Sequence, residues 1–520
     1  MNKLNFKSTE DGIHYLLDTA TEKEWSYIVE SLNTARDKAS ESLNQNLYDS
    51  LEWPTNQQAY INYLNQFVLW IPQQSGGAAW QDPTTLHSQE VYDRLCHYYY
   101  LVDQKTSIGV LAQNIPWFSQ FLVSYANLWG KFLNTPESFN STILKSFIQF
   151  SPQYRIEDSM NDGIPNANWN TFNEFFAREL NPYLRPIDNP GNNKTVVMPA
   201  DCTYRKKYDI RADSTIEEIV IKQTHTYANI AQLLEGSEYA QSFSNGTFIH
   251  YFLAPYSYHR FHAPVSGVVQ DCRAVQGLTF LQVEIHEDGP KKGQFNAPDD
   301  AENGYEFLQA RGILTIDTTN SPDGDIGVVA VIPVGMCQVS SVHMQDLSGK
   351  SINKGDEFGY FMFGGSDIIM LFQEGKQPVL NEQTSYRHYG TSTAISPSYV
   401  VAKSKWQNTN IKITSGNPAT ISYINGEWTA NPNDNNGKLY GPNGNPNYIK
   451  AKPGYTMPNE NEGALIGKVG DSIFLVGESC TIPSNLTGDL ELCINDDLNG
   501  EYGAGFTDNL GIMVVQVSIG

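Results

Sequence analysis

The sequence predicts an α+β multidomain protein. We expect a helical N-terminal domain over residues 1–150, a β-rich middle domain over 151–390 and a C-terminal β-sandwich over 398–520. Three observations predict this arrangement. The 520 residues exceed the usual size of one domain, and hydrophobic residues (40%) outnumber charged ones (18%), as in folded proteins. The apolar period is helical at the start of the chain and β-like later.

The helical prediction rests on a cap and on apolar spacing. Thr21 and Glu24 have the T-x-x-E spacing of a capping box, which marks the start of a helix. Apolar residues recur at helical spacing in three stretches: Trp25, Ile28, Val29 and Leu32; Val91, Leu95, Tyr98 and Val102; and Phe118, Phe121, Leu122, Tyr125, Trp129 and Phe132. Such stripes can line a ligand pocket, but a buried core is the favoured interpretation.

Short β-type runs separated by Gly, Pro and Asp follow from about residue 195. In the middle domain they are Thr247–Leu253, Gly267–Val269, Phe280–Ile285, Gly327–Ile332 and Ile368–Phe372. A polar bridge near 375–396 leads to a region rich in Asn, Gly and Pro. Its runs predict a small sandwich: Tyr399–Ala402, Ile411–Ile413, Ile473–Val476, Leu490–Ile494 and Ile512–Val517.

Charge and composition restrict the partners and the compartment. A net charge of −23 disfavours binding to nucleic acids and to anionic membranes. Acidic residues occur before any apolar run of signal-peptide length, and no segment has the pattern of a membrane span. The six cysteines are scattered without a CxxC pair. We therefore expect a cytoplasmic protein.

Three segments of the middle domain carry polar groups that suit catalysis. They contain Asp201 after an apolar run, the pair His259 and His262, and Ser366 after two glycines. Each alone is ambiguous, because an Asx cap, core histidines or a hairpin turn would look the same. Together they supply a carboxylate, an imidazole and a hydroxyl, which are the groups that activate a serine. The G-x-S-x-G elbow of α/β-hydrolases is absent at 364–368, so the serine needs another use.

The segments resemble the phosphatidylserine decarboxylase family, whose members make a pyruvoyl group from an internal serine. The resemblance rests on five segments in the family's order: TFNEFFARELNPYLRPID from Thr171, MPADCTY, YSYHRFHAPVSG, the stretch from Ile313 to Val342, and KGDEFGYFMFGGS ending at Ser366.

The resemblance implies self-processing between Gly365 and Ser366. His262, oriented by Asp201, would deprotonate the Ser366 hydroxyl, which then attacks the Gly365 carbonyl. β-Elimination and hydrolysis would leave a pyruvoyl group at residue 366 and separate fragments 1–365 and 366–520. The pyruvoyl ketone would form a Schiff base with the substrate amine and accept the electron pair left by CO₂. The family pattern makes His259 the general acid, with Phe252, Tyr256, Tyr258 and Phe261 as wall residues or core.

The sequence favours a free amino acid, such as an aromatic one, as substrate. Lipid-acting members typically carry Leu-Gly-Ser-Thr, whereas this chain has Phe-Gly-Gly-Ser at 363–366 and resembles the amino-acid branch with a helical N-terminal domain. The alternative is a phosphatidylserine decarboxylase that makes phosphatidylethanolamine. A rival from another class is a carbohydrate-binding protein with an inert decarboxylase core.

Residues 398–520 resemble the calcium-dependent galactose-binding bacterial lectins, on VVAKSKWQNTNIKITSGNPATISYINGEWTANP, GALIGKVGDS and LTGDLELCINDDLNGEYGAGFTDNLGIMVVQVSIG. The resemblance implies a Ca²⁺ site, with ligands at or near Asn431, Asp496, Glu501, Asp508 and Asn509. An Asp/Asn-rich loop capped by its own backbone is an equal alternative. The lectins' sugar-contact motif has no counterpart here, so a carbohydrate ligand and a homo-oligomeric role both stay open.

Overall fold

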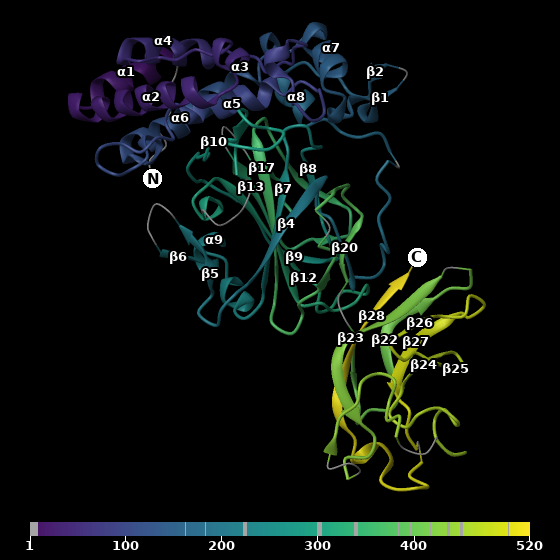
Figure 1. Cartoon of the computed structure of the whole chain (residues 1–520). Coiled ribbons are helices and arrows are strands. Elements are labelled where there is room, and N and C mark those ends of the chain that lie inside the picture. Colours follow the sequence, from purple (N-terminus) through teal and green to yellow (C-terminus); the bar gives the residue numbers. More distant parts are fainter. Residues whose placement is uncertain are drawn as a thin grey trace.

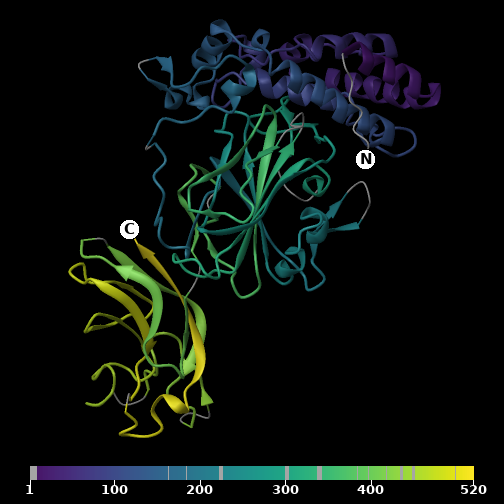
Figure 2. The same ribbon diagram turned by 180° about the vertical axis from the view of Figure 1, so that it is seen from behind.

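The computed structural model describes residues 9–161, 163–182, 184–221, 226–298, 304–336, 342–382, 384–395, 398–416, 418–433, 437–447, 451–497 and 499–519. Figures 1 and 2 show, from opposite sides, a layer of helices over one end of a β-rich centre, and a separate two-sheet unit beyond the other end. None of the helices in the described ranges has the length and apolar character needed to cross a membrane.

The helical layer begins with the predicted cap. Thr21 Oγ1 accepts from the backbone N–H of Glu24, and the Glu24 carboxylate accepts from the N–H of Thr21. The apolar stripes of the sequence are buried along α2, α5 with the following Val102, and α6, except for Val29 and Phe132, which are half-buried. The helices are α1 (Thr9–Thr19), α2 (Glu22–Ser42), α3 (Gln45–Asp49), α4 (Gln57–Phe67), α5 (Glu90–Tyr100), α6 (Pro116–Phe132), α7 (Ser141–Phe150) and α8 (Phe172–Phe176).

An eight-stranded sheet, antiparallel at every strand pair, forms the middle of the molecule. Its spatial order is β15 (Ser351–Ile352), β9 (Gly267–Val275), β12 (Arg311–Asp317), β13 (Val328–Met336), β17 (Gly365–Phe372), β7 (Thr247–Leu253), β4 (Cys202–Asp209) and β19 (Tyr386–Arg387). The predicted run Thr247–Leu253 coincides with β7. Strand β17, which carries Ser366, lies between β13 and β7 inside the sheet.

The two faces of β17 enter different cores, because successive side chains of a strand alternate. Ile368 and Met370 join a core that is continuous with the helical layer. Ile369 and Leu371 join a second core, closed by the hairpin β5 (Thr215–Ile221) and β6 (Thr226–Asn229) and by α9 (Ile230–Leu233). The helical layer therefore shares a core with only one face of the sheet.

The predicted strand over 280–285 is largely wrong: only β10 (Glu284–Ile285) forms there, paired with β11 (Phe295–Asn296). Side chains take the place of a neighbouring strand. Asp103 accepts from the backbone N–H of Val283 at 2.8 Å, and the Gln113 side chain donates to the carbonyl of Leu281 at 3.0 Å. The backbone groups are thus satisfied without a long ladder.

Smaller sheets complete the middle region. They are β14 (Val342–Met344), β16 (Glu357–Phe361) and β8 (Arg260–His262); β18 (Val379–Leu380), β20 (Ser392–Ile395) and β3 (Thr195–Val197); and β1 (Met160–Asn161) with β2 (Ile164–Pro165). Segment 337–341, part of one predicted motif, lies outside the described residues. The five described cysteines, at 96, 202, 272, 480 and 493, are free thiols.

The C-terminal unit consists of two four-stranded sheets around one core that contains Trp428. One sheet has the order β21 (Ser398–Val401), β28 (Leu510–Ile519), β23 (Ala419–Thr429) and β26 (Ser479–Thr481). The other has the order β22 (Gln407–Ile413), β27 (Gly488–Ile494), β24 (Leu465–Val469) and β25 (Ser472–Leu475). Two sheets around a common core are the predicted sandwich.

Candidate active site

Ser366 lies at the start of β17, beneath the helical layer. It is fully buried and sits opposite Gly335 of β13 and Leu253 of β7. Gly364, two residues earlier, has φ = +155°, a value that L side chains rarely adopt. The Ser366 hydroxyl is therefore held within the sheet, and the two residues before it are glycines, which carry no Cβ atom.

His259 is the imidazole that contacts this hydroxyl. Its Nδ1 lies 3.2 Å from Ser366 Oγ, and its Nε2 lies 3.3 Å from the carbonyl of Pro255. A carbonyl only accepts, so Nε2 carries the proton in the neutral ring and the Nδ1 lone pair faces the hydroxyl. This tautomer can accept a proton from Ser366.

The surroundings keep His259 neutral. Its ring stacks on Phe176 of α8, with centroids 4.1 Å apart, and it has no exposed surface. Burial, followed by the positive charge of Arg178, lowers the pKa of His259 to about 3. The ring is consequently an uncharged proton acceptor across the physiological range.

His262 is placed differently from the expectation, because the contact with Ser366 belongs to His259. Nδ1 of His262 donates to the carbonyl of Gly355 at 2.8 Å, and Nε2 lies 3.1 Å from the hydroxyl of Tyr258. Both ring nitrogens are thus occupied. Burial first, with Arg260 adding to it, lowers the pKa of His262 to about 4.

Asp201 does not bond to either histidine in the structure. Its carboxylate accepts from the Arg185 guanidinium at 2.8 Å and from the backbone N–H of Tyr389 at 2.8 Å. The ring of Tyr389 stacks on His262, with centroids 3.7 Å apart and planes 1° apart. Asp201 therefore reaches His262 only through Tyr389, and the expected direct pair is absent.

Residues from the helical side complete the site; Asn173 was not singled out in the sequence, and Trp129 was named there only as part of an apolar stripe. Asn173 of α8 accepts from the backbone N–H of Phe363 at 3.1 Å, and Trp129 of α6 meets the Phe363 ring edge-on at 5.3 Å. Arg178 and Arg185 both lie in the segment that resembles the family's entry motif. The entry motif could have drawn attention to these two arginines, although it does not say what either of them does.

A cavity of about 390 Å³ adjoins the site. Pro255, whose carbonyl contacts His259, lines it together with Phe252 and Tyr256, two of the four residues expected as substrate-site walls or core. Tyr258 instead contacts His262, and Phe261 packs on Phe358 in the core.

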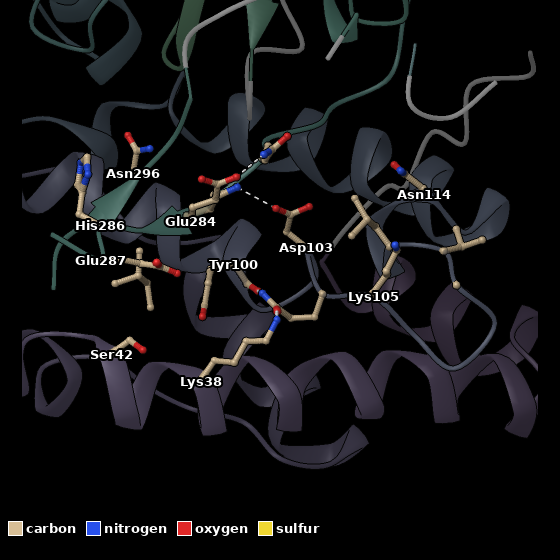
Figure 3. Close-up of a pocket in the computed structure, with 17 residues that line it drawn as sticks. Lys38, Ser42, Tyr100, Asp103, Lys105, Asn114, Glu284, His286, Glu287 and Asn296 are labelled. Carbon is tan, nitrogen blue, oxygen red and sulfur yellow. Dashed lines mark hydrogen bonds between the residues drawn. The ribbon is translucent and has the colours of Figure 1, made fainter. Parts of the chain in front are cut away.

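A larger cavity of about 1280 Å³ lies away from the serine, between the helical layer and β10. Figure 3 shows Lys38 and Asp103 on its helical side, with Glu284 and His286 across from them. Neither Ser366 nor His259 lines either cavity, but Pro255, whose carbonyl contacts His259, lines the smaller one, which is therefore the better candidate for the substrate site.

In the sandwich, Asn431, Asp496 and Asp508 line a cavity of about 380 Å³. Burial, followed by the charges of Asp508 and Asp497, raises the pKa of Asp496 to about 6. Asn509 is buried beside Ala402, whose carbonyl accepts from its amide at 3.1 Å, and Glu501 is not among the residues that line the cavity.

Comparison with solved structures gives little for the sandwich. A chain described as "EclA N-terminal domain; PllA-like lectin" is 24% identical, with 24% of this chain and 95% of that chain covered. The TM-score is 0.18, too low to support an argument. The lectin resemblance therefore stays a prediction.

The family comparisons concern the catalytic region. Residues 172–394 match the family model for phosphatidylserine decarboxylase. A phosphatidylserine decarboxylase proenzyme of Chlamydia trachomatis is 31% identical over 234 residues, which are 44% of this chain and 69% of the relative. The decarboxylase iboD of Amanita muscaria is 26% identical, with 51% and 80% covered. The L-tryptophan decarboxylase of Psilocybe cubensis is 25% identical, with 59% and 82% covered. Taken with the buried serine and imidazole, these matches make the chain a member of the phosphatidylserine decarboxylase family and a decarboxylase.

Proposed function

We propose that the chain cleaves itself between Gly365 and Ser366 and then decarboxylates a free aromatic amino acid with the resulting pyruvoyl group. The observation that carries this proposal is the 3.2 Å contact between Ser366 Oγ and His259 Nδ1 at a fully buried strand end. A serine with only a structural role has no need of a neutral imidazole that faces its hydroxyl.

In the processing step, His259 takes the Ser366 proton while Oγ attacks the carbonyl carbon of Gly365. The Gly365–Ser366 peptide bond breaks as the ester forms. β-Elimination then releases the Gly365 carboxylate, and hydrolysis of the remaining dehydroalanine yields the ketone and ammonia. The residues around position 366 fit a pyruvoyl group, because Gly364 and Gly365 carry no side chain and Ser366 is shielded from water.

In the decarboxylase, a bound pyruvoyl group supplies an electron sink for the pair left by CO₂. His259 remains next to residue 366, where it can hold the proton that returns to the former α-carbon. We assign positioning roles to His262 and Asp201. The successive contacts from Asp201 to Tyr389, from Tyr389 to His262 and from His262 to Tyr258 hold the segment that precedes His259.

The cavity favours an amino acid over a phospholipid. Its volume of about 390 Å³ is in the range of small-molecule sites, and its walls come from the sheet and from the helical layer. Tyr92, Tyr154, Phe252 and Tyr256 supply aromatic surface, which suits an aromatic side chain. The relatives named as L-tryptophan decarboxylase and iboD point in the same direction.

We also propose a calcium ion in the sandwich cavity, held by oxygens of Asp496 and Asp508 and by groups near Asn431 and Glu501. Oδ2 of Asp496 is buried without a hydrogen bond in the described part of the chain, as is Oδ1 of Asn509. Oxygen-only groups of this kind suit Ca²⁺. A cytoplasmic location fits the free thiols, while sugar binding and oligomer formation stay predictions.

The test is denaturing mass analysis followed by a CO₂ assay. We expect fragments that end at Gly365 and start at residue 366, with the Ser366→Ala chain uncut as the control. The cut protein is then incubated with tryptophan, phenylalanine and tyrosine, and separately with phosphatidylserine vesicles. An uncut 58.2 kDa wild-type chain would contradict self-processing, and CO₂ from the vesicles alone would assign the lipid as substrate.

A further inference from the structure

Three ionisable side chains gather on the face of the central sheet opposite to the Ser366–His259 contact. They are His250 on β7, Glu306 in the 3-10 turn Tyr305–Phe307, and Asp367 on β17. All three have no exposed surface, and their ligand atoms lie within 4.8 Å of one another. Their neighbours Ile369 and Phe307 belong to the second apolar core.

These atoms are too far apart for ordinary hydrogen bonds and are spaced closer to the separations found between metal ligands. Nε2 of His250 lies 3.3 Å from an Asp367 oxygen and 3.8 Å from a Glu306 oxygen. Hydrogen bonds from N–H to oxygen have their optimum near 2.9 Å. Ligand distances of about 2.0–2.2 Å around a tetrahedral ion place the ligand atoms about 3.3–3.6 Å apart.

Tyr305 orients one ligand in the way that residues behind a metal site do. Its hydroxyl donates to Oδ2 of Asp367 at 2.7 Å. The other oxygen, Oδ1, points toward His250 and accepts no hydrogen bond from the described residues. A carboxylate fixed at one oxygen and open at the other is ready to bind a cation.

Electrostatics gives the same answer. Two carboxylates this close together in an apolar core repel each other unless an opposite charge lies between them. A divalent ion supplies that charge, and one imidazole with two carboxylates is a ligand set that zinc-class metals accept. We propose that His250, Glu306 and Asp367 bind one divalent transition-metal ion inside the catalytic domain.

The site has a structural role in this proposal. None of the three residues lines any of the three cavities that border the catalytic domain, and Asp367 directly follows Ser366. The ion therefore fixes the start of β17 from the face opposite His259. If the proposed self-cleavage occurs, His250 and Glu306 lie on fragment 1–365 and Asp367 on fragment 366–520, so the ion also joins the two fragments.

Metal content of the full-length chain is the first measurement. After growth with zinc and dialysis against metal-free buffer, we expect about one zinc-class ion per chain by mass spectrometry. Glu306→Gln and Asp367→Asn should lower this at least tenfold, because each removes one charged ligand. Asp93→Asn, which alters a buried carboxylate of α5 that accepts a hydrogen bond from Gln89, is the matched control and should keep the ion. Ser366→Ala should keep it too, which separates this proposal from self-cleavage.

X-ray absorption at the zinc edge of the wild-type protein covers the case in which a variant fails to fold. We expect nitrogen and oxygen ligands only, with one imidazole. A sulfur ligand, a zinc-treated wild-type chain without metal, or full metal content in folded Glu306→Gln and Asp367→Asn would overturn the proposal.

Discussion

At the scale of single residues, His259 and His262 have different proposed roles, and substituting each of them by Gln distinguishes these roles. His259→Gln removes the nitrogen that faces Ser366, so we expect self-cleavage to slow at least 100-fold. His262→Gln alters a ring that contacts Tyr258, Gly355 and Tyr389 but has no hydrogen bond to Ser366, so we expect less than about a tenfold change.

The fraction of cut chain over time, from denaturing gels of freshly synthesised protein, measures both effects. His343→Gln, a half-buried ring stacked on Tyr360, is the control and should process at the wild-type rate. A His262→Gln chain that stays whole while His259→Gln is cut would restore the assignment expected from the sequence.

The pH dependence of processing follows from the environment of His259. With its pKa lowered to about 3 by burial and Arg178, the ring stays neutral from pH 8 to pH 5.5. The cleavage rate should therefore be flat over that range. An imidazole with the ordinary pKa near 6.5 would lose about tenfold between these limits. A fall of that size, with a midpoint near pH 6.5, would contradict the buried neutral ring.

The sequence predicts the residue types of this site but not their partners. His259 and His262 are both evident, yet extended residues three apart point in opposite directions, so only one can face Ser366. Which one does so depends on where β8 begins, and that is set by its pairing with β16. The Arg185 partner of Asp201 lies 16 residues away and has no local signature.

At the scale of elements, α8 connects the helical layer to the segment that carries the serine. Asn173→Ala removes the acceptor for the buried N–H of Phe363, three residues before Ser366. An unsatisfied buried group costs about 1–3 kcal/mol, so we expect that loss of unfolding free energy together with slower self-cleavage.

Denaturant unfolding and the cleavage time course test this prediction together. Asn33→Ala is the matched control. The Asn33 amide donates to the carbonyls of Val29 and Thr55, which are both distant in sequence from the serine segment. That variant should lose comparable stability without slower processing. Equal processing in Asn173→Ala and Asn33→Ala would show that α8 does not position the serine segment.

Elements with strong local signals were predictable, and those that depend on distant groups were not. The capping box at Thr21 and the apolar run of β7 both appear in the structure where the sequence placed them. The run 280–285 has equal β character, but its backbone is bound by Asp103 and Gln113 from another part of the chain. No local pattern reveals that such side chains will replace a strand.

At the scale of the whole molecule, the helical layer and one face of the catalytic sheet share one continuous core. Sequence composition anticipated several domains, since the period changes along the chain. It did not anticipate that residues of α5, α6 and α8 would share a core with β7 and β17, because that packing brings together segments more than 70 residues apart. The shared core suggests that burial of ionisable groups in either part affects the stability of both.

Three buried imidazoles in this core provide the test of that coupling. Burial lowers the pKa of His97, on α5, to about 3, of His259 to about 3 and of His262 to about 4. The unfolded chain takes up a proton at each near pH 6.5, whereas the folded chain does not until far lower pH. Each contribution to stability is therefore complete above pH 6.5 and declines as the pH falls toward the folded pKa. The decline amounts to about 2 kcal/mol per group at pH 5.

Other buried groups titrate in the opposite direction, so the difference between paired variants is the useful quantity. We expect the unfolding free energy of the wild type minus that of His97→Gln to fall by about 2 kcal/mol between pH 7.5 and pH 5. Denaturant unfolding at constant ionic strength measures it, and His343→Gln serves as the control because that ring is half exposed. If the helical layer and the sheet unfold together, the loss of stability in acid will appear in probes of both parts. A difference that stays constant with pH would show that His97 titrates normally in the folded chain.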